Sequence, residues 1–136
     1  MKNICFIILI ILLSFIFSCK KETYWGTADI VGFDPCTALD SLNRGYIVIT
    51  LESKDTVVTY NLPSNIFSFP KSYFVNYKSD CLFPDSVRFD YRIHIKYSIT
   101  QEKDKIAIQC LDDIYTGIFY QYTKFRQITL HSARIE

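Results

Sequence analysis

Apolar and polar residues alternate without a break along one stretch of the chain, VRFDYRIHIKYSIT, from Val87 to Thr100. Val, Phe, Tyr and Ile side chains occupy every second position, and charged or hydroxyl side chains occupy the positions between them. A period of two residues is typical of a β-strand that has one face in a core and the other in water. The stretch predicts a strand of about fourteen residues, which is long enough to coil around a small barrel.

Similar patterns predict further strands on both sides of this stretch, at 25–33, 45–52, 56–61, 105–111 and 127–135. Gly26 and Gly32 suit a bulge or a sharply coiled first strand. In the last strand the apolar residues fall on even positions before His131 and on odd positions after Ser132. This change predicts a second bulge near these two residues. Strand signals therefore dominate from residue 23 to the end of the sequence.

The segment 62–84 interrupts the alternation, and its three prolines are compatible only with loops and one or two short helical turns. Its apolar side chains are too numerous for a free loop, so we expect them to close one end of the core: Phe67, Phe69, Tyr73, Phe74 and Phe83. Three strands, a partly helical connector between strands 3 and 4, and then two long strands predict an all-β, small OB-like barrel. A β-sandwich is the alternative.

The length of 136 residues suits one domain, and a formal net charge of +1 gives no general attraction to nucleic acid. The polar face of the 87–100 strand nevertheless contains several charged side chains: Arg88, Asp90, Arg92, His94 and Lys96. The aromatic residues of the same stretch, Phe89, Tyr91 and Tyr97, alternate with these charged residues and so belong to the face that points to the core. A groove that binds single-stranded nucleic acid combines basic and aromatic side chains on one face. We therefore expect the solvent side of a strand and no nucleic-acid partner.

The sequence lacks the signatures of common catalytic and metal sites, including GxSxG, the P-loop, CxxC and HExxH. His94 and His131 are the two histidines, and neither is expected to be catalytic. We expect a protein that is not an enzyme and that needs no cofactor or metal ion.

The N-terminus follows another pattern, in which a short positive start precedes an apolar run of about fourteen residues, Ile4 to Phe17. A membrane-spanning helix needs roughly twenty such residues, so residues 1–18 are predicted to be a cleaved signal peptide. The end of this run, IFSC, resembles the lipobox of bacterial lipoproteins. The resemblance implies that Cys19 receives a diacylglyceryl group and acyl chains such as palmitate. An ordinary signal peptide is the alternative.

Residues 19–22 would then be the lipidated cysteine and a tether, followed by a single domain at 23–136. A tether of about four residues spans roughly 14 Å, so the domain would lie against the membrane. In many lipoproteins an Asp directly after the cysteine retains the protein in the inner membrane. Here Lys20 occupies that place, which favours the outer membrane of a bacterial envelope and leaves its periplasmic and surface faces open.

Three further cysteines belong to the predicted domain: Cys36, Cys81 and Cys110. An oxidising compartment favours one disulfide and one remaining thiol. In an OB-like barrel all three would gather at one end. Cys36–Cys110 is the first choice because both residues adjoin predicted strands, Cys36–Cys81 is the second, and three buried thiols are a further alternative.

Four segments resemble a group of small lipoproteins from Bacteroidota: GTADIVGFDPCTA (26–38), DTVVTYNLPSNIF (55–67), FPDSVRFDYRI (83–93) and QCLDDIY (109–115). The resemblance implies an exported, lipid-anchored protein, favours the Cys36–Cys110 pair, and implies no activity. We expect a non-catalytic binding or scaffolding module for another envelope protein. Tyr73 and Tyr77 of the connector would be its exposed contacts, and core packing explains these two residues equally well. The alternative is an oligosaccharide-binding module, which would need aromatic side chains in a shallow exposed groove.

Overall fold

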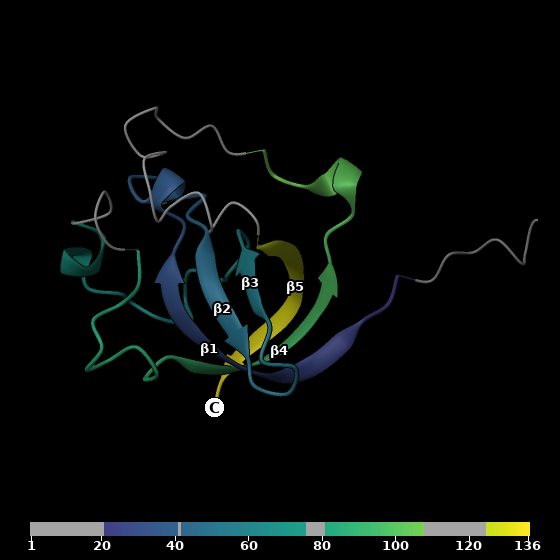
Figure 1. Ribbon diagram of the computed structural model, residues 1–136, viewed down its shortest axis with the longest axis horizontal. Helices are drawn as coiled ribbons and strands as arrows, with labels where there is room; N and C mark the ends of the chain where they lie inside the picture. The colour runs from purple at the N-terminus through teal and green to yellow at the C-terminus, as the bar shows by residue number, and fades with distance from the viewer. Residues whose placement is uncertain (1–20, 41, 76–80, 108–124) are drawn as a thin grey trace, which may run out of the picture.

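The computed structural model describes residues 21–40, 42–75, 81–107 and 125–136. Within them, five strands form a closed barrel: β1 (Tyr24–Phe33), β2 (Tyr46–Thr50), β3 (Thr56–Thr59), β4 (Arg92–Ile99) and β5 (Arg126–Ile135). The order around the barrel is β1-β2-β3-β5-β4, and β3 and β5 are the parallel pair (Figure 1). This is the strand order of an OB-like barrel, so the prediction of an all-β domain with this architecture is confirmed.

Both predicted bulges are present. The pairing of β1 with β2 shifts between Ile30 and Gly32. The pairing of β4 with β5 shifts after Lys96, where His131 is the extra residue on β5. Because a bulge bends a strand and increases its twist, β1 can pair with β4 through its first half and with β2 through its second half. Figure 1 shows β1 curving around the barrel in this way.

The barrel interior is filled by aliphatic side chains from all five strands, and the connector between β3 and β4 adds aromatic rings to them. Phe83 is fully buried and Phe74 is nearly so. The ring of Phe83 lies 5.2 Å from that of Phe69 and 5.1 Å from that of Tyr73, measured between centroids. The predicted packing of the connector against the core is confirmed, as is its helical turn, η2 (Lys71–Phe74).

Two strand predictions are wrong in their bounds. The segment 87–90 forms a turn, in which the Asp90 N–H donates to the Val87 carbonyl at 3.1 Å, and β4 begins only at Arg92. The edge of β1 that such a long strand would need is already occupied, because the Phe33 N–H donates to the Cys81 carbonyl at 2.9 Å. The other prediction, a strand at 105–111, is not formed over residues 105–107, and its remainder lies outside the described residues.

Two of the three cysteines of the predicted domain lie in the described part of the chain. Cys36 belongs to a short 3-10 helix, η1 (Pro35–Thr37), and Cys81 is buried. No disulfide joins these two residues to each other, so the second-choice pairing is not formed. Cys110 and Cys19 lie outside the described residues, and the Cys36–Cys110 disulfide and the lipidation stay predictions. Among the described residues, no helix has the length and apolarity that a membrane span requires.

Candidate ligand-binding groove

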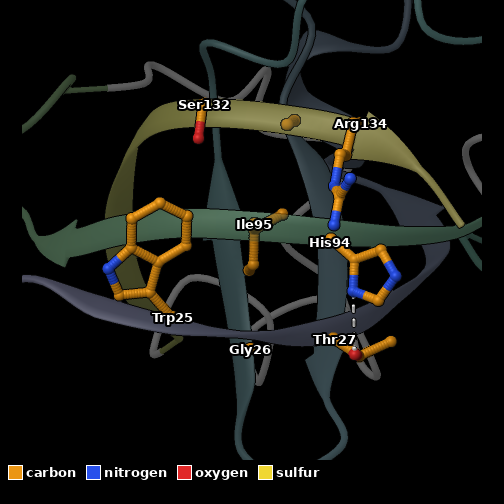
Figure 2. Close-up of a pocket in the computed structure, with 8 residues that line it drawn as sticks. Trp25, Gly26, Thr27, His94, Ile95, Ser132 and Arg134 are labelled. Carbon is orange, nitrogen blue, oxygen red and sulfur yellow. Dashed lines mark hydrogen bonds between the residues drawn. The ribbon is translucent and has the colours of Figure 1, made fainter.

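A groove of about 340 Å³ crosses three neighbouring strands of the barrel. It is lined by residues of β1 (Trp25, Gly26 and Thr27), β4 (His94 and Ile95) and β5 (Ser132, Ala133 and Arg134). In Figure 2 the three strands run side by side, with Trp25 at one end of the groove and His94 and Arg134 at the other. A volume of this size lies at the lower end of the range for small-ligand sites.

Strand register places the polar wall of the groove. Thr27 of β1 lies directly opposite His94 of β4, which in turn lies opposite Arg134 of β5. The Nδ1 atom of His94 is 3.2 Å from the Thr27 hydroxyl oxygen, and Figure 2 shows the Arg134 guanidinium pointing toward the imidazole. Three polar groups from three strands therefore converge in one row.

The aromatic wall belongs to the next outward row, two residues along each strand. There Trp25 lies opposite Lys96, and Lys96 lies opposite Ser132. Successive outward side chains of a strand are about 6.6–6.8 Å apart, which sets the spacing between the two rows. The residues between the rows point their side chains inward, as Ile95 does at 1% exposure, so their backbone forms the floor.

Trp25 is the most exposed aromatic side chain of this surface, at 71%. The Lys96 ammonium lies 4.8 Å from the centroid of its ring, within the range of a cation–π contact. Lys96 is not among the residues that line the groove. We conclude that the ammonium helps to orient the indole from outside the groove, and that the groove side of the indole stays open to a ligand.

A third outward row holds an ion pair instead of a groove. Arg92 Nε lies 2.8 Å from Asp29 Oδ1, Arg92 Nη2 lies 3.2 Å from Asp29 Oδ2, and Glu136 is 3.6 Å from the same guanidinium. The Asp29 side chain is only 3% exposed. Hydrogen bonding to Asp29, and then its charge, raise the pKa of Arg92. Arg92 therefore fastens β4 to β1 beside the groove and is not available to a ligand there.

The sequence placed the charged residues of the 87–100 stretch on one face, and the structure divides them. Arg92, His94 and Lys96 share the outer face of β4, whereas Arg88 and Asp90 lie in the turn before it. Arg88 donates to the Phe83 carbonyl at 3.1 Å. This face also carries an aromatic side chain that the sequence analysis missed, because Trp25 comes from another strand. Pairing β1 with β4, as the barrel order requires, would have revealed it.

The predicted partner contacts have different outcomes. Tyr73 is half-buried in the aromatic cluster, and its hydroxyl oxygen accepts a hydrogen bond from the Tyr91 hydroxyl at 3.3 Å. Burial raises the pKa of Tyr91 to about 12, and the Tyr73 bond adds to this effect. The core-packing interpretation of Tyr73 is therefore the correct one. Tyr77 lies outside the described residues.

Within the described ranges, no group of three or more His, Cys, Asp or Glu side chains is arranged to hold a metal ion. The groove over β1, β4 and β5 is therefore considered as a site for an organic ligand and not for a metal ion. Comparison of the chain with protein-family models, with curated proteins and with solved structures gave no match.

Proposed function

We propose that the protein is a non-catalytic module of a bacterial envelope that binds an oligosaccharide in the groove over β1, β4 and β5. One observation carries this proposal: a strongly exposed indole, that of Trp25, forms one wall of a concave site. Folded domains normally bury most of the large apolar surface of a tryptophan side chain. An indole that stays exposed in a concave site is therefore a good candidate for contact with a ligand.

The chemistry of the groove suits a sugar. A sugar ring has apolar C–H faces that can lie on an aromatic ring, and hydroxyl groups around its rim that need hydrogen-bond partners. Trp25 offers the flat apolar surface, and Thr27, Ser132 and His94 offer groups that donate and accept hydrogen bonds. Barrels of this topology bind oligosaccharides elsewhere, typically through the face of strands 2 and 3. The groove here lies on other strands, so its own side chains support the proposal.

Binding is favoured over hydrolysis. Most glycoside hydrolases need two carboxylic acids across the scissile bond. The eight residues that line the groove include no carboxylic acid. Another envelope protein as the main partner stays a prediction. We place it second because Tyr73 packs inside the protein and because the groove is concave rather than flat.

Replacing Trp25 with alanine is expected to weaken saccharide binding roughly tenfold or more, as is usual when a central aromatic contact is removed. Affinity gel electrophoresis of the detergent-solubilised protein, in gels that contain single polysaccharides, measures this. Phe89→Ala is the matched control, because Phe89 is 57% exposed and does not line the groove. The proposal would be refuted if the wild type and the Trp25 variant migrated equally in every gel that retards the Phe89 variant.

The anchoring part of the proposal concerns Cys19, with sorting to the outer membrane and a Cys36–Cys110 disulfide in the exported domain. Radiolabelled palmitate is expected to enter the wild-type protein and not a Cys19→Ser variant, because serine lacks the thiol that carries the diacylglyceryl group. A Cys5→Ser variant, altered within the predicted signal peptide, serves as the control and should be labelled normally. Equal labelling of the Cys19 and Cys5 variants would contradict a lipid anchor at this position.

A further inference from the structure

Arg134 differs from the other four arginines of the chain, and all five lie in the described residues. Arg88, Arg92 and Arg126 each form an ion pair with a carboxylate. Arg44 donates two hydrogen bonds to the Ala38 carbonyl and lies over the Phe74 ring. The Arg134 side chain has no ion pair or hydrogen bond with any described residue, and Arg134 is the arginine that lines the groove.

The carboxylates nearest to this surface are already engaged. Asp29 binds Arg92 through both oxygens, and Glu136 Oε2 lies 3.6 Å from Nε of the same guanidinium. Glu52 accepts a hydrogen bond from the Thr27 backbone N–H at 2.7 Å. Two cations without a carboxylate partner among the described residues, Arg134 and Lys96, thus adjoin a groove whose described lining contains no acid. A cation at the groove that lacks a carboxylate partner can attract an anionic ligand.

We infer that the groove selects saccharides that carry an anionic group, a carboxylate or a phosphate, and that Arg134 binds this group. This inference rests on the proposed function and adds the ligand class to it. A guanidinium offers paired N–H donors that match both oxyanions. Arg134 and Trp25 lie in adjacent outward rows, two strands apart, at opposite ends of the groove. A saccharide with one ring on the indole can therefore reach the guanidinium with an anionic group of the same unit or of the neighbouring unit.

A glycan array with matched pairs tests the inference on the solubilised full chain. Each acidic saccharide, for example an oligogalacturonate or an oligomannose with 6-phosphate groups, is printed beside its neutral methyl-ester or dephosphorylated counterpart. We expect the acidic members to bind about tenfold or more tightly than their neutral partners, since hydrogen bonds to charged groups are the stronger ones. Because Trp25 is the chain's one tryptophan, its fluorescence in titrations of the bound saccharides reports directly on the groove.

Arg134→Gln is expected to remove this preference for the acidic member, whereas Trp25→Ala weakens both members of a pair. Lys103→Gln is the control for net charge, because Lys103 lies in η3 (Glu102–Asp104) and does not line the groove. The array also shows whether the protein prefers saccharides with a carboxylate or saccharides with a phosphate group, and either preference supports the inference. Equal binding of acidic and neutral partners would overturn the inference and leave the proposed function standing. Binding to no printed glycan would overturn the proposed function itself.

Discussion

Phe83→Ala is expected to lower the free energy of unfolding by about 3–5 kcal/mol, as is usual when a buried phenylalanine is truncated. Phe83 is completely buried, and its ring contacts those of Phe69, Tyr73, Phe74 and Tyr91 at centroid distances of 5.1 to 6.5 Å. The substitution removes these edge and tilted contacts and leaves a cavity where the connector meets the barrel. Urea unfolding followed by far-UV circular dichroism measures the loss. Trp25 is too exposed to report on the core.

Phe89→Ala is the matched control for this measurement. Phe89 is only six residues further along the chain but is 57% exposed, so its truncation should change stability by no more than about 0.5 kcal/mol. A loss in the Phe83 variant as small as that in the Phe89 variant would show that the connector does not contribute to the core.

The same two residues show how far sequence patterns reach. Alternation assigned Phe89 to the core, because its parity matches that of Ile93 and Ile95, which are buried. The residues of a turn can continue an alternating pattern by chance. In addition, periodicity does not reveal whether the edge of the neighbouring strand is free to form hydrogen bonds. The connector residues 81–83 occupy that edge of β1, as the bond between the Phe33 N–H and the Cys81 carbonyl shows. The existence of the five barrel strands was therefore predictable, whereas the length of β4 was not.

The candidate groove shows a different limit. The side chains of its two outward rows can be assigned to the outer face from local alternation, once each strand is known. What brings Trp25 beside Lys96, and Thr27 beside His94, is the register between two strands whose paired residues are about seventy positions apart in sequence. The register between β4 and β5 depends on the bulge at His131, which was predictable from the parity change in β5. Strand order and this bulge bring β4 and β5 into register, whereas the register of β1 against β4, which places Trp25 beside Lys96, does not follow from the sequence pattern.

Gly32→Ala is expected to destabilise the protein by about 3 kcal/mol or more. A Cβ atom at this position would overlap the Cys81 carbonyl oxygen and would lie 3.0 Å from the Leu82 Cα, and both neighbours are backbone atoms that cannot rotate away. Relieving the overlap means separating β1 from the connector. That separation endangers two hydrogen bonds, from the Phe33 N–H to the Cys81 carbonyl and from the Phe83 N–H to the Val31 carbonyl. Steric strain and these two bonds together account for the expected magnitude.

Gly26→Ala is the matched control for Gly32→Ala, because it makes the same change on the same strand. There the three atoms nearest to the added Cβ all belong to the carboxylate end of Glu52, a flexible side chain that can swing into water. Loss of the hydrogen bond from the Thr27 N–H to Glu52 is expected to lower the free energy of unfolding by about 1 kcal/mol. Alanine also restricts the unfolded chain more than glycine does, which offsets part of this loss. Urea midpoints for the two variants compare the effects directly. An equal loss of stability in the two variants would contradict this explanation of Gly32. The close backbone approach at the β1 bulge would then not be the reason for glycine at position 32. A general intolerance of the twisted strand to any added side chain would explain both positions.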